Sequence, residues 1–251
     1  MSTVQNAALV TGAAHRVGRA LATDLAAHGW AVAIHCHRSV AAAEALAADI
    51  RAGGGKAAVV TADLASEDET AGLIAATTDA VGPLRLLVNN ASLFEDDSWE
   101  TATRESYEAH MATNLRAPFL LSQGFAAQAP DHSVIVNIID QRVWRLTPKF
   151  LSYTLSKAGL WTLTQTLAQA LAPRIRVNAI GPGPVLPSSR QSLESFDAQV
   201  AALPLGASTG LKEICAALRF ILETPSMTGQ MIALDGGQHL SWQTPDVMVQ
   251  E

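Results

Sequence analysis

The sequence predicts an α/β fold with one doubly wound parallel sheet of about seven strands and helices on both of its faces. Short apolar runs alternate with alanine-rich helical segments along the 251 residues. The strand runs are apolar throughout rather than at every second position, as expected when both faces of a parallel sheet are covered. No linker, charge block or internal repeat divides the chain. We therefore expect a single domain over residues 1–251.

Seven apolar runs define the expected strands. In chain order they are 7–12, 31–36, 56–64, 84–92, 133–140, 174–183 and 230–237. The segments between them are long enough and rich enough in helix formers to be helices, and they cover 17–28, 41–52, 67–82, 104–128, 150–171 and 211–223. The Pro- and Ser-rich stretch 181–190 favours a functional loop. We expect a substrate loop at about 184–206 and a C-terminal tail at 241–251.

The composition argues against several classes of protein. Hydrophobic residues make up 49% and charged residues 16%, which is typical of a buried core rather than of disorder. The net charge of −6 does not favour nucleic acid or an anionic membrane as a partner. Two cysteines, Cys36 and Cys215, are too few for a disulfide framework. The sequence contains neither a signal-like N-terminus nor an 18-residue apolar run, so we expect a cytoplasmic protein.

The first strand runs into the stretch "TGAAHRVGRA", which predicts a dinucleotide site of the Rossmann type. Gly12 and Gly18 flank a turn that opens a helix. Such a turn places backbone N–H groups and the positive end of the helix where a pyrophosphate can sit. A glycine pair alone often marks only a tight turn, but here it stands between a strand and a helix at the N-terminus.

The second strand ends in "HCHRS" and indicates NADPH rather than NADH. An acid for the ribose 2′-hydroxyl is missing there, and His37, Arg38 and Ser39 stand in its place. A guanidinium beside a hydroxyl suits a 2′-phosphate; the alternative is a solvated basic turn. His35 and His37 flank Cys36, but neighbours on a strand point to opposite faces, so we expect no metal.

Tyr153 and Lys157 are four residues apart, so they share one face of a helix. An ammonium near a phenol favours the phenolate and lowers the pKa of the phenol. The tyrosine is then a usable proton donor near neutral pH. The alternative is an ordinary surface pair.

Asp140 stands at the carboxyl end of the apolar fifth strand. Parallel sheets bind their ligands at this edge. A carboxylate there can accept from N–H groups of a ligand or pass a proton to Tyr153. The alternative is a turn-forming or helix-capping aspartate.

The motifs "TGAAHRVG", "NNAS", "YTLSK" and "GPG", in this order, make the chain resemble the short-chain dehydrogenase/reductase family from Ala7 to Leu240. The resemblance implies Asn114 as a water-positioning residue beside the catalytic Asp140, Tyr153 and Lys157, and it implies a homotetramer. It also implies cofactor contacts, at the adenine by Asp63 and Leu64 and elsewhere by Gly12, Val17, Asn89, Ala91, Ser92, Tyr153, Lys157, Pro182 and Gly183.

Two departures from the family pattern resemble one branch, the pteridine reductases, which include bacterial dihydromonapterin reductases. Arg16 stands where most members carry glycine, and Asp140 stands where most carry serine. This resemblance implies that Arg16 lies over the cofactor phosphates and reaches the pterin. It implies a substrate site of Arg16, Ser92, Phe94, Asp140 and Tyr153, in which Phe94 and the nicotinamide sandwich the pterin ring.

The function expected from this resemblance is NADPH-dependent reduction of a dihydropterin, or of dihydrofolate, to the tetrahydro form. One alternative is a reductase of a ketone or a 3-oxoacyl thioester. Asp140 argues against it, because a carboxylate is unfavourable near a developing oxyanion. A second alternative is a non-catalytic NADPH-binding sensor, which would not need the proton donor Tyr153.

Overall fold

A computed structural model describes residues 6–188 and 190–248 of the chain, and its core is one parallel sheet of seven strands. The strand order is β3-β2-β1-β4-β5-β6-β7, which confirms the predicted fold class. The strands are β1 (Ala7–Val10), β2 (Ala31–Cys36), β3 (Lys56–Thr61), β4 (Leu84–Asn89), β5 (Ser133–Ile138), β6 (Ile175–Pro182) and β7 (Met231–Leu234).

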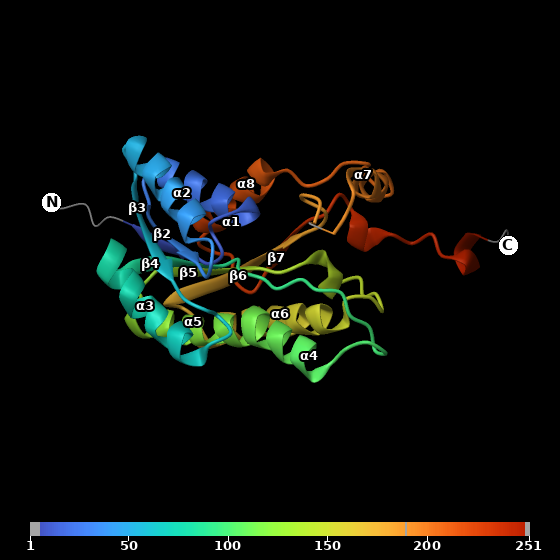
Figure 1. Cartoon of the computed structure of the whole chain (residues 1–251), viewed down its shortest axis with the longest axis horizontal. Helices are drawn as coiled ribbons and strands as arrows, with labels where there is room; N and C mark the ends of the chain where they lie inside the picture. Colours follow the sequence, from blue (N-terminus) through green and yellow to red (C-terminus); the bar gives the residue numbers. More distant parts are fainter. Residues whose placement is uncertain (1–5, 189, 249–251) are drawn as a thin grey trace.

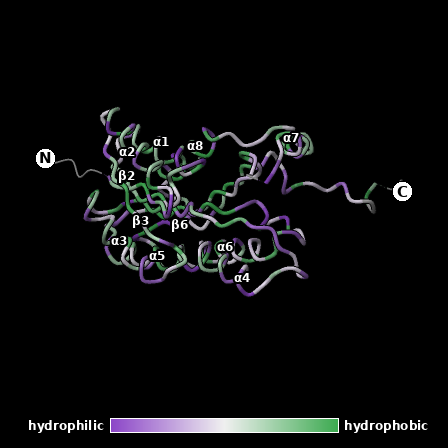
Figure 2. The backbone as a smooth tube through the Cα atoms, viewed as in Figure 1, coloured by the Kyte–Doolittle hydropathy of each residue, from purple (hydrophilic) through white to green (hydrophobic). Residues whose placement is uncertain are grey.

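Helices cover both faces of the sheet (Figure 1). One layer consists of α1 (Arg16–Ala27), α2 (Val40–Ala52) and α8 (Leu211–Glu223). The other consists of α3 (Glu67–Val81), α4 (Arg104–Met111), α5 (Ala117–Gln128) and α6 (Leu151–Leu171). The side chains of β1 alternate between two cores: Ala8 and Val10 pack towards the first layer, and Ala7 and Leu9 towards the second. Figure 2 shows the resulting hydrophobic centre. Strands buried on both faces explain the unbroken apolar runs of the sequence.

Two helices differ from the prediction. The segment 104–128 is not one helix, because a π-helical turn, Ala112–Arg116, separates α4 from α5. The predicted substrate loop at 184–206 contains a helix, α7 (Leu193–Ala201), that the sequence analysis did not predict. Ser192 caps this helix by accepting the N–H of Ser195, a local signal for a helix start. The C-terminal tail is described as far as Met248, and the predicted residues 249–251 lie outside the described residues.

The strand order reverses direction at β1, which lies between β2 and β4. Ligands of such sheets bind where the strand order reverses, at the carboxyl ends of the strands. Val10 is level with Val88 of β4, and Asn89 of β4 is level with Asn137 of β5. The segments that follow β1, β4 and β5 therefore lie at one edge of the sheet. Within residues 6–188 and 190–248, no helix has the length and apolarity needed to cross a bilayer.

Gly18 provides a test of packing at this edge. A Cβ atom there would clash with the Gly12 carbonyl and lie 2.6 Å from Asn90 Nδ2, so we expect Gly18→Ala to destabilise the fold by about 1–3 kcal/mol. Gly72, exposed on α3 with nothing near its missing Cβ, is the matched control. Gly72→Ala should stabilise by about 0.5–1 kcal/mol. Urea unfolding of both variants measures the difference, and equal effects would contradict the close approach.

Candidate active site

The turn after β1 is tied to the end of β4 by three hydrogen bonds of the Thr11 hydroxyl. Thr11 Oγ1 donates to the Val88 carbonyl (3.3 Å) and accepts the N–H groups of Asn90 (2.9 Å) and Ala91 (3.0 Å). Asn90 returns a bond from Nδ2 to the Thr11 carbonyl (2.8 Å). Gly12 has a φ of +62°, and a Cβ there would lie 2.9 Å from Ala91 Cα. Thr11 and Asn90 therefore set the shape of the glycine turn, and the sequence analysis missed both.

The helix that opens from this turn leaves its first backbone amides available to a ligand. The N-cap residue of α1, His15, forms no capping hydrogen bond with its side chain, and the first turn carries no acid. An uncapped helix N-terminus with a positive dipole end suits a phosphate. Gly12 and Val17 lie at this turn, as predicted from the sequence.

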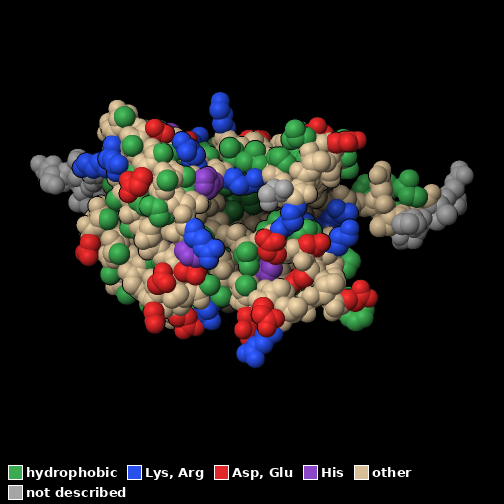
Figure 3. Space-filling view, viewed as in Figure 1, with side chains coloured by type: hydrophobic (Ala, Val, Ile, Leu, Met, Phe, Trp, Pro, Cys, Tyr) green, Lys and Arg blue, Asp and Glu red, His purple; other side chains and the backbone are tan. Residues whose placement is uncertain are grey.

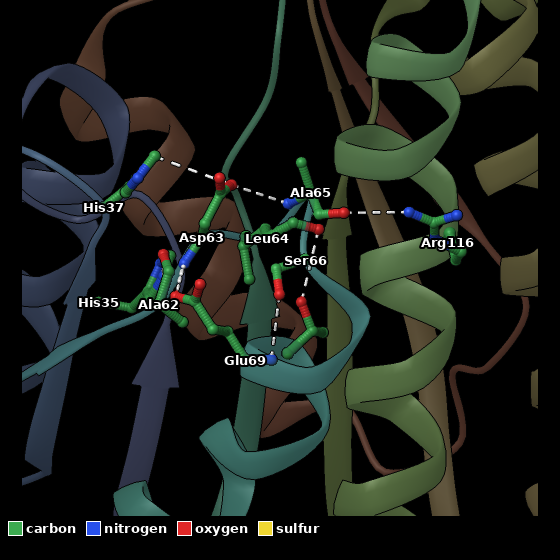
Figure 4. Close-up of polar contacts among 10 residues, drawn as sticks. His35, His37, Ala62, Asp63, Leu64, Ala65, Ser66, Glu69 and Arg116 are labelled. Atoms are coloured by element: carbon green, nitrogen blue, oxygen red, sulfur yellow. Dashed lines mark hydrogen bonds and ion pairs between the residues drawn. The ribbon is translucent and has the colours of Figure 1, made fainter.

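His35, which lies beside Ala62 in Figure 4, links the loop after β3 to the glycine turn. Its Nδ1 accepts the N–H of Gly12 (3.1 Å), and its Nε2 donates to the Ala62 carbonyl (3.1 Å). These partners define the neutral tautomer with the proton on Nε2. Burial lowers the pKa of His35 to about 4. The side chain is thus an uncharged bridge between the two segments, and the sequence analysis considered it only as a metal ligand.

The loop after β3 is itself braced by polar contacts. Asp63 Oδ1 accepts the N–H of Ala65 (2.9 Å), and Glu69 Oε2 accepts the N–H of Asp63 (2.7 Å). His37 Nδ1 lies 3.8 Å from Asp63 Oδ1, and both side chains are partly exposed (Figure 4). Leu64, the next residue, is buried in the core beneath α3.

The basic residues after β2 are open to solvent. His37 and Arg38 are exposed, and Ser39 is half-buried at the N-terminus of α2. Across the described part of the chain, Arg38 has no ion pair. The structure therefore brings the glycine turn, Asp63 and the predicted 2′-phosphate residues to one end of the sheet edge. In Figure 3 this face of the molecule is hollowed between the two helix layers, and Lys, Arg and His side chains border the hollow.

At the other end of the same edge, Tyr153 and Asp140 form a hydrogen-bonded pair. Tyr153 Oη donates to Asp140 Oδ2 (2.9 Å), and the backbone N–H of Arg142 donates to Asp140 Oδ1 (2.8 Å). Lys157, one turn further along α6, donates from Nζ to the Ile138 carbonyl (2.9 Å). Tyr153 and Lys157 are buried, whereas Asp140 is half-buried. The three residues that the sequence predicted as neighbours are in contact or within one helical turn.

The electrostatics of this cluster differ from the expectation in one respect. Burial, followed by the charge of Asp140 and its hydrogen bond, raises the pKa of Tyr153 well above its usual value. The expected lowering of the Tyr153 pKa by Lys157 is therefore wrong for this arrangement, because burial and the adjacent Asp140 carboxylate both raise that pKa. Burial raises the pKa of Asp140, against the opposing effects of Arg142, Tyr153 and Lys157. Burial lowers the pKa of Lys157 to about 8. Tyr153 thus carries its proton at neutral pH, on an oxygen that faces Asp140.

Asn114 lies in the π-helical turn and is fully buried. Its Oδ1 accepts the N–H of Leu93 (2.7 Å), and its Nδ2 donates to the Leu93 carbonyl (2.9 Å) and to Ser156 Oγ (3.0 Å). Such π turns often occur at functional sites because they redirect a side chain. Here the turn points Asn114 at the segment after β4 and at α6, where Tyr153 also lies.

The side chain of Asn89 faces the interior of the sheet. Asn89 Nδ2 donates to Asn137 Oδ1 (2.8 Å), and Asn137 Nδ2 donates to Thr164 Oγ1 on α6 (2.8 Å). This buried chain fixes α6 against β4 and β5. Only the backbone of Asn89 faces the sheet edge. Ala91, two residues later, packs against Gly12.

Arg16 is the first residue of α1, beside the glycine turn. Its φ of +52° is left-handed, a region that favours glycine. Its guanidinium donates from Nη1 to the Pro187 carbonyl (2.9 Å) and from Nη2 to the Leu186 carbonyl (3.0 Å). The side chain therefore holds the predicted substrate loop to the start of α1, and both terminal nitrogens are engaged there.

Phe94 lies beside the catalytic cluster. It stacks on Phe150 with a centroid distance of 4.5 Å and an interplanar angle of 12°, and its ring meets Tyr153 edge-on at 4.7 Å. Arg190, within the predicted substrate loop, donates to the Phe94 carbonyl (2.6 Å) and pairs with Glu95. One face of Phe94 is thus covered by Phe150, a residue that the sequence analysis missed. Ser92, the other predicted substrate contact of this segment, is exposed.

Pro182 is the last residue of β6, and Gly183 follows it. Gly183 donates its N–H to the Leu234 carbonyl (2.8 Å), and a Cβ there would lie 2.7 Å from Asp235 Cα. Close backbone approach therefore requires glycine. In the part of the chain that the structure describes, no group of three His, Cys, Asp or Glu side chains could hold a metal ion.

The family model described as short chain dehydrogenase matches residues 6–198. The chain therefore belongs to the short-chain dehydrogenase family of oxidoreductases.

Among solved structures, the chain is similar to FolM alternative dihydrofolate reductase 1 of Brucella canis in complex with NADP. The two are 52% identical with a TM-score of 0.94, and the match covers 96% of this chain and 97% of that chain. The same protein from Brucella suis, also with NADP, gives 52% identity and a TM-score of 0.93 over 96% and 98% of the two chains. By sequence, the chain is 33% identical to a 3-oxoacyl-[acyl-carrier-protein] reductase of Synechocystis, over 92% of this chain and 95% of the relative.

The lowered pKa of His35 predicts a loss of stability in acid. Between pH 6.5 and pH 4 an unfolded histidine gains a proton that His35 does not accept in the folded protein. The unfolded state binds more protons in this window, so stability falls with falling pH, by about 3 kcal/mol. His35→Asn removes the titrating group and should reduce this fall, in urea unfolding at pH 7 and pH 4.5. The exposed His15→Asn is the control, and an equal fall in both variants would contradict the assignment.

Proposed function

We propose that the protein reduces a dihydropterin, such as dihydromonapterin or dihydrobiopterin, or dihydrofolate, to its tetrahydro form with NADPH. The observation that carries the proposal is the hydrogen bond between Tyr153 and Asp140. A carboxylate at this position suits a nitrogen heterocycle, because it accepts from ring N–H and amino groups. The 52% identity to proteins described as alternative dihydrofolate reductases supports the same substrate class.

The residues at the sheet edge fit NADPH. The uncapped amides of α1 and the glycine turn suit the pyrophosphate, and exposed Arg38 with Ser39 suits a 2′-phosphate. The similar structures contain NADP or NADPH, which agrees with this assignment. Asp63 and Leu64 would lie along the adenine, and Pro182 and Gly183 would border the nicotinamide. Bound NADPH would supply the hydride to the carbon of the C=N bond.

The chain itself would hold and move the proton. Tyr153 is a protonated phenol at neutral pH, and it would donate its proton to the nitrogen of the C=N bond. Asp140 orients that phenol and can return a proton to it. Lys157 is anchored on the Ile138 carbonyl and keeps two further N–H donors for the ribose hydroxyls of the cofactor. Asn114 holds the backbone of Leu93, next to Phe94, and would position a water molecule in the site.

A second candidate is reduction of a 3-oxoacyl thioester, which the sequence relatives favour. In that reaction negative charge develops on the substrate oxygen, and the carboxylate of Asp140 beside Tyr153 would oppose it. Initial rates of NADPH oxidation with a dihydropterin, dihydrofolate and a 3-oxoacyl thioester, measured in parallel, decide between the two. Turnover of the thioester alone would overturn the proposal, and cofactor binding without any turnover would favour a sensor.

Asp140→Ser tests the role of the carboxylate. We expect kcat/KM for a dihydropterin to fall about 100-fold or more, because proton transfer and orientation both depend on this group. The Kd for NADPH, from fluorescence titration, should stay within about twofold. Tyr153→Phe provides the reference for loss of the proton donor. A parallel loss of turnover and NADPH affinity in Asp140→Ser would instead indicate a structural role.

The oligomeric state is proposed as a homotetramer, in line with the family resemblance. The face of α4, α5 and α6 carries a groove of about 720 Å³ with a largely apolar lining that includes Met111, Leu115, Phe119 and Leu163. Phe119 is 40% exposed, and a large exposed apolar surface suits burial against another subunit. Phe119→Glu should shift the mass measured by light scattering to a smaller species, and an unchanged mass would exclude this face.

We also propose a cytoplasmic location, in keeping with two free, buried cysteines.

A further inference from the structure

Arg142 lies at the centre of the candidate site, although no motif pointed to it. It belongs to the 3-10 turn Gln141–Val143 that directly follows Asp140, and its backbone N–H donates to Asp140 Oδ1 (2.8 Å). Its guanidinium carbon lies 4.8 Å from the ring centroid of Phe150 and 5.8 Å from that of Phe94. The side chain is half-buried. Its positive charge opposes the rise in pKa of both Asp140 and Tyr153, so it acts on the reacting groups.

The hydrogen-bond donors of Arg142 are almost unused. Its Nε is buried and has no partner in the described structure. Among the described residues its side chain makes one bond, from Nη1 to Thr147 Oγ1, which is long at 3.5 Å. By contrast, Arg16 donates from both terminal nitrogens to carbonyls of the substrate loop. A buried guanidinium donor without an acceptor is unfavourable by an amount similar to a lost charged hydrogen bond. An acceptor supplied by a ligand would remove this penalty.

We propose that Arg142 binds the substrate by donating to a carbonyl oxygen of its ring, beside the N–H or amino group that Asp140 accepts. The two side chains together offer a donor and an acceptor side by side. That pattern matches the edge of a heterocycle in which a carbonyl adjoins an N–H, as in the lactam of a pterin. The identity of the heterocycle rests on the proposed function. Arg142 thus joins the substrate residues that the family resemblance implied, whereas Arg16 holds the substrate loop through its terminal nitrogens.

Room remains on both partners for this contact. Each carboxylate oxygen of Asp140 has two lone pairs, and the structure uses one on Oδ1 for Arg142 N–H and one on Oδ2 for Tyr153. The aromatic rings of Phe94 and Phe150 hold the guanidinium by cation–π contact rather than by hydrogen bonds. The planar group is therefore fixed in position while its N–H donors stay available.

Arg142→Met tests the contact, since it keeps the length of the side chain and removes the donors. We expect KM for a dihydropterin to rise about tenfold to hundredfold, the range for one charged hydrogen bond. The Kd for NADPH should change less than about twofold. Arg142→Lys keeps the positive charge but loses the paired donors of the guanidinium. Its KM should lie between those of the wild type and Arg142→Met. Arg145→Met, at an exposed position of the same segment, is the matched control and should behave as the wild type.

The ratio of affinities for two inhibitors would not change if Arg142 had only a structural role. Pterin and 2,4-diaminopteridine differ in that an amino group replaces the carbonyl oxygen. Their affinity ratio should shift about tenfold towards the diamino compound in Arg142→Met. An unchanged affinity ratio and an unchanged KM in Arg142→Met would overturn the inference. The proposed function would still stand if the wild type turned over the pterin. An equal loss of NADPH affinity would also overturn it. A wild-type protein without pterin binding or turnover would overturn both.

Discussion

The hydroxyl of Thr11 is the contact on which the site depends. It joins the turn after β1 to the end of β4, through one donated and two accepted hydrogen bonds. β1 and β4 are the neighbouring strands at which the sheet order reverses. Because these strands are parallel, everything that follows them in sequence emerges at the same edge. The glycine turn, the Phe94 segment and the catalytic pair inherit their relative positions from this junction.

Two polar systems extend from that junction in opposite directions. On one side, neutral His35 spans the glycine turn and the loop after β3, and it keeps the dinucleotide end rigid without adding charge. On the other side, Asn114 and the chain from Asn89 to Thr164 fix α6 below the sheet. Tyr153 and Lys157 stand on that helix. The protein thus spends its buried polar groups on holding two binding regions in one orientation, as preorganised sites require.

The sequence predicted the sheet and the catalytic neighbours because both follow from short-range periodicity. Strands buried on both faces leave unbroken apolar runs, and a four-residue spacing places Tyr153 and Lys157 on one helix face. The π turn at Asn114 was not predicted, because helix-forming residues run through it without a break. The contacts of the Arg16 and Arg142 side chains were not predicted either, since the direction of a long flexible side chain depends on its tertiary neighbours. The sign of the pKa shift of Tyr153 depended on its burial and on the adjacent charge of Asp140, which no spacing reveals.

The left-handed backbone of Arg16 creates a conflict between stability and activity at one position. An L-residue in this conformation is less favourable than glycine by about 1 kcal/mol. Replacing it by glycine would relax the backbone and at the same time release Leu186 and Pro187 from the guanidinium. The two effects oppose each other in the unfolding free energy but not in the ordering of the substrate loop. Glycine at this position would therefore change the free energy of unfolding little, whereas the substrate loop would lose two hydrogen bonds that hold it to α1.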